Sequence, residues 1–444
     1  MDILIITTYF PPDSAVAAVR PYMFAKYLIR FGHKVTVLRS GDFCREPDRS
    51  YPPLHGLRIL SYLGKDSPAE AFERGEIDSW PFSEGKSRIS FLPEKIRLPI
   101  AEVYHSFANL WDVERQEHSI EAPLNRQKDV LRSLRDEGDR FDIIFATYGR
   151  LENVYAGKYA AELFGCPWIL DLRDPIATPF IYEGLSLLRM KHFQDRWISQ
   201  ADACTVVSNG MRESSEGLSR SAKTVTIYNG YEPFEEESKG LPAADVLSFC
   251  YTGTVYRGKQ DAAPLLNALK QLGSEGKIDL ARVRIDYAGP NFAYLQTAAK
   301  ALGMEPCVVD HGYVTRTEAS RLQKSSDIFL VLSWNARVFK GGISGKFYEG
   351  IRCGRPILAL IAGDTPDSEL YELNETYHYG FCYEECRPQQ FQQLCDFLLQ
   401  AYRQKMEHGS LDYAPSEEFS TAFRYDTLTK KLETLCEKLI RERA

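Results

Sequence analysis

The stretch Gly341–Leu358, which reads GGISGKFYEGIRCGRPIL, decides how this sequence is interpreted. It follows an apolar segment of strand character and opens a helix. The helix ends at Gly354-Arg355-Pro356, and another apolar strand begins directly afterwards at Ile357. Glycine and proline end helices in this way because they do not continue the regular backbone. The pattern predicts a strand–loop–helix–strand unit of a parallel α/β sheet.

The start of this helix combines groups that bind anions. Backbone N–H groups of residues 343–346 have no partner inside the helix, and the helix dipole favours negative charge there. Lys346 adds a positive charge, and Glu349 lies one turn further along the same face. We expect the N–H groups and Lys346 to hold the phosphates of a nucleotide diphosphate. We expect Glu349 to accept hydrogen bonds from the hydroxyls of its ribose. The alternative is a pair of solvated surface side chains, but a lysine is unfavourable at a helix start unless an anion binds.

Strands and helices alternate along most of the chain. Short apolar runs typical of parallel strands buried on both faces recur, with helical segments between most of them. They occupy residues 3–7, 34–38, 142–147, 168–172, 203–207 and 224–228, and then 248–251, 283–288, 307–309, 328–332 and 357–361. The alternation predicts an α/β protein with two doubly wound, Rossmann-like domains.

The domain boundaries follow from composition. Residues 229–243 are rich in Glu, Gly and Pro, which indicates a linker between domains. We therefore predict an N-terminal domain over residues 1–235, with an irregular insertion at about 41–140, and a C-terminal domain over residues 236–414. A helix within residues 415–444 carries a leucine stripe at positions 428, 432, 435 and 439. We expect that stripe to pack back on the first domain.

The composition excludes several classes of protein. The chain has 444 residues and a net charge of −7, which argues against nucleic-acid binding because such proteins are usually basic. Its ten cysteines are scattered and form no CxxC pair, so no metal site is expected. No signal peptide and no apolar run of membrane-spanning length is recognisable. We expect a soluble, cytoplasmic protein.

One region leaves two interpretations open. Residues 88–100 mix bulky apolar and basic side chains, and residues 101–111 have helical spacing. They are either a patch that touches the inner face of a membrane or a lipid-linked acceptor, or an ordinary insertion packed on the first domain. We favour the insertion, because amphipathic surface helices are common.

Four motifs, taken in order, resemble the GT-B glycosyltransferases, specifically the large retaining family numbered four. They are Tyr9–Pro12 followed by Arg20, Pro167-Trp168 followed by Asp171–Pro175, Tyr251–Lys259, and Ser344–Glu349 followed by Gly354–Pro356. Each motif is weak alone, but their common order is specific. The resemblance covers the chain outside residues 41–140. It implies the GT-B fold, in which two Rossmann-like domains face a cleft and a C-terminal helix crosses back to the first domain.

The resemblance also implies an activity. It is the transfer of a sugar from a nucleotide-diphosphate donor, with a UDP-sugar favoured, to a hydroxyl of a glycan or lipid-linked acceptor. The anomeric configuration is retained, no metal or other cofactor takes part, and the setting is cell-surface polysaccharide or glycoconjugate biosynthesis. Lys346, Lys259 and Glu349 are implied to carry the chemistry. Donor contacts are implied for those three and for Gly253, Thr254, Arg257, Gly312, Tyr313, Val314, Gly341, Gly342, Ile343, Ser344 and Gly345.

The chain departs from the family pattern at three places. A second glutamate usually stands eight residues before the ribose-binding one, and Gly341 occupies that position, so this donor helix is a single-glutamate variant. Thr254 stands where an arginine is usual, and Arg257 is the nearest replacement. A histidine common in the first domain is absent, and Asn153 or Val154 falls about there.

Alternatives stay open for the other candidates. Lys259 and Arg257 are either donor contacts or loop charges, and Asp171, Arg173 and Asp174 are either substrate contacts or a structural ion-pair cluster. Residues 311–314 either hold the nucleotide base through their backbone or form a simple turn. Two other functions compete with transfer: a nucleotide-sugar epimerase of the same fold, and a catalytically degenerate binding or scaffold protein.

Overall fold

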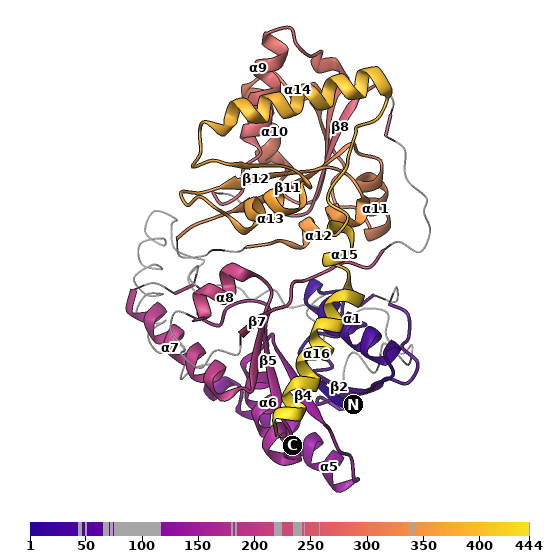
Figure 1. The fold of residues 1–444 in the computed structure, drawn as a ribbon, viewed down its shortest axis with the longest axis vertical. Coiled ribbons are helices and arrows are strands. Elements are labelled where there is room, and N and C mark those ends of the chain that lie inside the picture. Colours follow the sequence, from indigo (N-terminus) through magenta and orange to yellow (C-terminus); the bar gives the residue numbers. More distant parts are fainter. Residues whose placement is uncertain are drawn as a thin grey trace, which may run out of the picture. The chain divides into compact units, whose positions relative to one another are not determined.

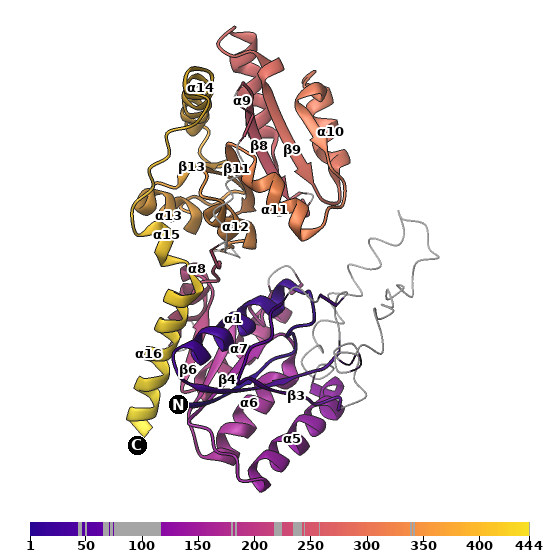
Figure 2. The same cartoon turned by 90° about the vertical axis from the view of Figure 1, so that its right-hand side faces the viewer.

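The chain forms two compact units, each built on its own sheet (Figures 1 and 2). Unit 1 comprises Met1–Tyr228 and Leu428–Ala444, and unit 2 comprises Asn229–Thr427. The computed structural model describes residues 1–42, 47–48, 51–64, 71, 74, 117–178, 181–182, 184–216, 224–233, 242–243, 245–256, 258–337, 340 and 342–443. Gly341, Arg257 and the region 88–111 therefore lie outside the described residues.

Unit 1 has a seven-stranded sheet in the order β3-β2-β1-β4-β5-β6-β7, with every pair parallel. Its strands are β1 (Asp2–Ile6), β2 (Lys34–Arg39), β3 (Arg58–Ser61), β4 (Ile143–Tyr148), β5 (Trp168–Leu172), β6 (Ala203–Val206) and β7 (Thr224–Thr226). Its helices are α1 (Val16–Arg30), α5 (Glu121–Asp136), α6 (Leu151–Phe164), α7 (Gly184–Gln200) and α8 (Asn209–Glu216).

Both faces of this sheet are covered, as the continuous apolar strands predict. Alternate strand residues such as Ile144 and Ala146 join the core formed with α5, α6 and α7. The intervening Phe145 points to the other face, where its ring lies 5.7 Å from that of Phe24 in α1.

Unit 2 has a six-stranded parallel sheet in the order β10-β9-β8-β11-β12-β13. Its strands are β8 (Leu247–Thr252), β9 (Val283–Ala288), β10 (Val308–Asp310), β11 (Ile328–Trp334), β12 (Ile357–Ala362) and β13 (Gly380–Glu384). Its helices are α9 (Ala263–Ser274), α10 (Phe292–Ala301), α11 (Arg316–Lys324), α12 (Gly345–Cys353), α13 (Glu369–Tyr377), α14 (Gln390–His408) and α15 (Phe419–Ala422). Two short 3-10 helices, Leu280–Arg282 and Glu305–Cys307, precede β9 and β10.

The strand order places a switch point in each sheet. In unit 2 the chain begins at β8, proceeds outward through β9 and β10, and then returns to build β11, β12 and β13 on the other side. This is the order of a doubly wound Rossmann sheet, and ligands of such sheets bind where the direction of winding reverses, beyond the carboxyl ends of the strands. The predicted α/β class with two such units is confirmed.

The last helix, α16 (Tyr425–Arg443), starts in unit 2 and continues in unit 1. Leu428, Leu432 and Leu439 of the predicted stripe are buried, and Leu435 is half-buried. His33 Nε2 lies 2.7 Å from Glu433 Oε1, which fixes the helix beside the end of α1.

Two parts of the fold were not anticipated from the sequence. The predicted insertion at 41–140 contains β3, which extends the sheet, and α5, which covers it. Four half-exposed residues make β3 too short and too polar to stand out as a buried strand. Strand β13 was also not predicted. None of the helices among the described residues is long and apolar enough to cross a membrane.

Candidate functional site

The helix α12 has one buried side and one polar side. Phe347, Tyr348 and Ile351 are buried, and the ring of Phe347 lies 5.2 Å from that of Tyr379 and 5.6 Å from that of Phe423. This aromatic packing sets the rotation of the helix. It leaves Lys346 and Glu349 partly exposed, at 28% and 37% of their side-chain surface.

Lys346 and Glu349 form an ion pair across one helical turn. Lys346 Nζ lies 2.8 Å from Oε1 and 3.0 Å from Oε2 of Glu349. Gln323 Nε2 of α11 donates to Glu349 Oε2 at 2.7 Å and to Thr252 Oγ1 at 2.6 Å. The carboxylate is therefore held from two sides, and it compensates the positive charge that Lys346 brings to a helix start.

The backbone of Gly253 approaches Lys346 closely. Gly253 follows β8 with φ of 140°, and a Cβ atom added to it would lie 2.7 Å from Lys346 Cε. Gly289, which follows β9 with φ of 150°, approaches Gly253 more closely still: a Cβ there would lie 2.2 Å from the Gly253 carbonyl oxygen. Only glycine allows these contacts, so backbone and Lys346 meet at the carboxyl edge of the sheet.

The segment Gly312–Val314 lies at the same edge, beyond β10. The Gly289 N–H donates to the Gly312 carbonyl at 2.8 Å, and the Gly312 N–H donates to Asp310 Oδ1 at 2.8 Å. His311 Nε2 lies 2.6 Å from Asp286 Oδ1, so this histidine is tied to β9. Tyr313 is 84% exposed.

The loop before α12 presents an unsatisfied hydroxyl. Ser344 is the N-cap residue, but its side chain does not cap the helix, and its buried Oγ finds no hydrogen-bond partner among the described residues. Serine at this position normally accepts a bond from the first helical turn. Gly342 is fixed by Ser333, whose hydroxyl donates to its carbonyl at 2.9 Å, and Ile343 and Gly342 both line a cavity of about 10 Å³. Gly345, the first helical residue, is exposed.

Lys259 and Thr254 lie in the loop after β8. The exposed Lys259 has its Nζ 5.7 Å from the ring centre of Trp334, at the end of β11. Thr254 is half-buried, and its carbonyl accepts a hydrogen bond from the Tyr251 hydroxyl at 2.9 Å. The structure thus brings Gly253, Lys346 and Glu349 into direct contact, whereas Lys259 lies against the neighbouring strand end.

Two cysteines beneath the pair remain uncharged. Burial, with a smaller contribution from the Glu349 carboxylate, raises the pKa of the Cys353 thiol to about 12. Burial also raises the pKa of Cys250 well above the usual thiol range. Because both thiols are neutral at physiological pH, Lys346 and Glu349 dominate the local charge.

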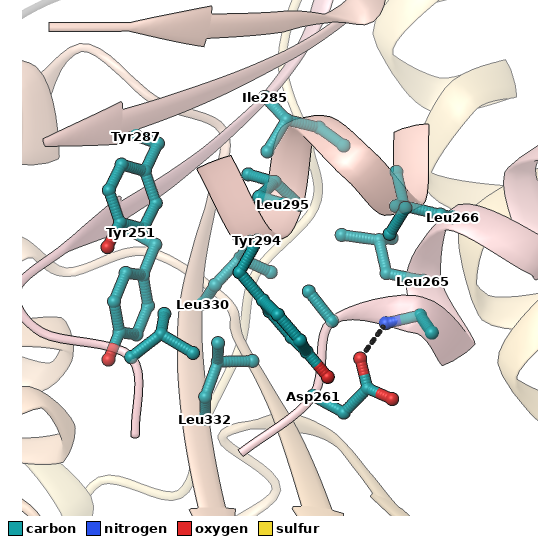
Figure 3. A pocket seen from close by; sticks show the side chains of 14 residues that line it. Tyr251, Asp261, Leu265, Leu266, Ile285, Tyr287, Tyr294, Leu295, Leu330 and Leu332 are labelled. Atoms are coloured by element: carbon teal, nitrogen blue, oxygen red, sulfur yellow. Dashed lines mark hydrogen bonds between the residues drawn. The ribbon is translucent and has the colours of Figure 1, made fainter. Parts of the chain in front are cut away.

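The larger apolar cavity of unit 2 is not this site (Figure 3). It measures about 20 Å³ and lies in the core between the sheet and helices α9 and α10, lined by side chains such as Leu265, Leu295 and Leu330. Tyr251 and Tyr287 stack beside it, with ring centres 5.8 Å apart. A cavity of this size holds about one water molecule, so it cannot take a nucleotide.

In unit 1 two charged residues of the sequence motifs, Arg20 and Asp171, form a structural ion pair. Arg20 and Asp171 are both buried, and Arg20 Nη2 lies 2.8 Å from Asp171 Oδ1. The hydroxyls of Thr147 and Thr205 complete the carboxylate's hydrogen bonds at 2.9 and 2.7 Å. Both oxygens of the buried Asp171 carboxylate are thus occupied, which favours the ion-pair interpretation of this residue over a substrate contact. Arg173 is half-buried and donates to the Tyr148 carbonyl at 3.2 Å, and Asp174 is exposed.

Three residues of the site were missed by the sequence analysis. Gly289 has a recognisable signal, because it follows its strand directly, as Gly253 does. Gln323 and Trp334 have no such signal in the sequence. Gln323 is one of many polar residues of helix α11, and Trp334 is the last residue of the apolar strand β11.

Comparisons with known proteins show which fold this architecture belongs to. The sequence matches no protein-family model, and no curated protein is significantly similar to it. Among solved structures, sucrose-phosphate synthase from Thermosynechococcus elongatus is similar, with a TM-score of 0.58 and 12% identity over 99% of both chains. HepE of Anabaena, solved with UDP and glucose, has a TM-score of 0.57 and 14% identity over 99% of this chain and 100% of its own. The catalytic domain of starch synthase IV from Arabidopsis thaliana, bound to ADP and acarbose, has a TM-score of 0.54 and 13% identity over 99% of both. These similarities in structure along the whole length show that the chain has the GT-B fold.

Proposed function

We propose that this protein is a retaining glycosyltransferase that uses a nucleotide-diphosphate sugar and needs no metal ion. The fold supports a transferase, and a similar structure, HepE, has been solved with UDP-glucose. A UDP-sugar is therefore our preferred donor. The acceptor is a hydroxyl of a glycan or a lipid-linked saccharide, in surface polysaccharide or glycoconjugate assembly.

The observation that carries this proposal is the polar start of α12. The Ser344 hydroxyl, which has no hydrogen-bond partner among the described residues, the N-terminal backbone of the helix and Lys346 lie within three consecutive residues, at the carboxyl edge of a doubly wound sheet. These are the groups that bind a diphosphate in such folds. Gly253 allows the backbone of the adjacent strand end to approach the same point.

The ion pair suggests how the site receives its ligand. Lys346 turns from Glu349 to the phosphates, and Glu349 stays in place because Gln323 donates to it. The Glu349 oxygen that Lys346 has left then accepts a hydrogen bond from a ribose hydroxyl. As the bond between the sugar and the diphosphate breaks, the acceptor hydroxyl oxygen bonds to the anomeric carbon on the same face, and its proton passes to the leaving phosphate oxygen. Lys346 together with the helix N–H groups stabilises the negative charge that develops on the diphosphate. Lys259 supplies a second cation to the same oxygens.

A screen of nucleotide sugars by thermal unfolding tests the proposal. UDP-glucose, UDP-galactose, UDP-N-acetylglucosamine, ADP-glucose and GDP-mannose are compared with the free nucleoside monophosphates. A donor that binds the folded state raises the melting temperature by mass action, and we expect a uridine series to do so. The donor that binds is then incubated with acceptors, and the anomeric configuration of the product is read by NMR. Stabilisation by no nucleotide sugar would contradict the proposal and favour a scaffold role, whereas an inverted product would contradict retention alone.

A further inference from the structure

The outward face of α7 in unit 1 is a second candidate surface, separate from the donor site. The helix buries a regular stripe that includes Met190, Phe193 and Trp197 in the unit 1 core. Its opposite face carries Leu185 and Leu188, which are 74% and 62% exposed. The core-facing side of the helix is therefore covered by the protein, whereas the aliphatic side chains near its N-terminus lie on the opposite side, which the core does not cover.

A third aliphatic side chain extends this apolar patch. Ile181 precedes the helix by three positions in the sequence and is 58% exposed. Large aliphatic side chains this exposed are unusual when they occur together, because each leaves apolar surface in water.

Basic side chains continue along the same face. Arg189, His192 and Arg196 follow the leucines at helical spacing and are exposed. The single acidic residue of α7, Asp195, is half-buried at the flank. The protein as a whole carries a net charge of −7, so this face is opposite in sign to the rest of the chain.

We propose that the outward face of α7 docks on an anionic lipid surface, with Ile181, Leu185 and Leu188 inserted among the acyl chains and Arg189 and Arg196 on the lipid phosphates. Aliphatic side chains beside arginines on one helix face are the composition of interfacial helices. Long arginine side chains reach the headgroup level while their stems stay near the apolar boundary.

A second copy of the chain fits this face less well. A stable dimer buries about 800 Å² on each partner, and three separated aliphatic side chains provide far less. A bilayer requires no matching protein surface, since lipids adapt to the inserted side chains.

The test is cosedimentation of the full chain with vesicles, in the absence of any nucleotide sugar. Vesicles of phosphatidylcholine alone are compared with vesicles that also contain phosphatidylglycerol. We expect the protein to sediment with the anionic vesicles, and high salt to weaken the binding because it screens the arginines. The double variant Leu185→Ser/Leu188→Ser should lower the partition coefficient about tenfold or more. The double variant Arg189→Gln/Arg196→Gln should remove the preference for phosphatidylglycerol.

Matched controls locate the effect. Val16→Ser changes an aliphatic side chain that is 75% exposed elsewhere on unit 1, and Lys431→Gln/Lys438→Gln removes two exposed cations from α16. Both should bind vesicles like the wild type. Absence of binding by the wild type, or equal loss in the controls, would overturn the proposal. Unchanged vesicle binding by the leucine variant, with a change from dimer to monomer in light scattering, would assign the face to a second copy instead. Because no donor is present, these outcomes are independent of the proposed transferase activity.

Discussion

At the scale of single residues, the candidate site contains one lysine in an unusual place, Lys346. A cation in the first turn of a helix is unfavourable, and here Glu349 compensates it at 2.8 Å. The pair is part exposed, and such pairs contribute little to folding, at most about 1 kcal/mol. The position of Lys346 is therefore better explained by binding than by stability.

Lys346→Ala should weaken donor binding without unfolding the protein. A charged hydrogen bond to phosphate contributes about 1.5–3 kcal/mol, so we expect an affinity about 10- to 100-fold lower by calorimetry. The melting temperature should hardly change. Lys277→Ala is the matched control, because Lys277 forms a similar exposed pair with Glu275 at 2.7 Å in the same unit. If Lys346→Ala lowered donor affinity only as far as it lowered the stability of the fold, Lys346 would have no direct role in binding phosphate.

Glu349→Gln should affect the recognition of ribose. The wild type is expected to bind a ribose donor more tightly than its 2′-deoxy or 3′-deoxy analogue, because a carboxylate accepts strong hydrogen bonds from hydroxyls. The variant should lose most of that discrimination, which competition binding measures. If the two proteins discriminate equally, the ribose contact is made by another residue.

Gly253→Ala should displace Lys346. The added Cβ would lie 2.7 Å from Lys346 Cε, and φ is already 140°, so both strain and a clash follow. Gly276→Ala is the control, since Gly276 also has positive φ, at 67°, but no atom lies within 4 Å of the added Cβ. Each variant should lose about 1–2 kcal/mol of stability in urea unfolding. Only Gly253→Ala should lose donor affinity, and equal binding by both variants would show that the close approach is irrelevant to the ligand.

At the scale of elements, two helices are each fixed by one buried side. The aromatic cluster of Phe347, Tyr379, Phe419 and Phe423 joins α12 to the turn between α13 and β13, to α15 and to the residue after α15. This packing orients the face of α12 that bears Lys346 and Glu349. The helix α16 is fixed differently, by its leucines and by polar contacts of Glu433.

The attachment of α16 should depend on pH. The pKa of Glu433 is lowered: burial acts to raise it, but hydrogen bonds from Lys430 and His33 outweigh that effect. A carboxylate with a depressed folded pKa stabilises the protein fully above its unfolded value, here 4.5, and loses that contribution as pH falls through the folded value. We expect Glu433→Gln to destabilise unit 1 by about 1 kcal/mol at pH 7 and by much less at pH 3.

Urea unfolding at the two pH values measures this difference. Glu437→Gln is the control, because Glu437 lies on the same helix but is exposed. A loss of stability in Glu433→Gln that is the same at both pH values would show that the carboxylate's charge is not involved.

At the scale of the whole molecule, the two sheets have the same winding order but different side chains at their switch points. The switch point of unit 2 has a cation and a helix start, whereas in unit 1 the Asp171 carboxylate is already occupied by Arg20, Thr147 and Thr205. We therefore expect the donor to bind unit 2.

Removal of divalent metal should leave transfer intact. Lys346, Lys259 and the helix start are proposed to offset the charge of the diphosphate, which in other enzymes requires a metal ion. Turnover is measured with and without EDTA after dialysis. Activity that disappears with EDTA and returns with Mg²⁺ would contradict the metal-free mechanism.

The sequence by itself determined the class of the fold. The alternation of apolar strands with helices is a local signal, since the spacing of apolar residues within each segment indicates which of its faces are buried. That signal was sufficient for two parallel α/β units, and for the helix that bears Lys346 and Glu349. The same signal did not reveal β3, because this strand has only four residues and all are half-exposed, as in a loop.

Only the tertiary structure decided how these parts meet. The approach of Gly253 to Lys346 joins residues 93 positions apart, and Gln323 reaches Glu349 from another helix. The exposed face of α7 is likewise visible only once the opposite face is seen in the core. Such contacts depend on long-range packing of the sheet and its crossover helices, which the spacing of residues along the chain does not encode.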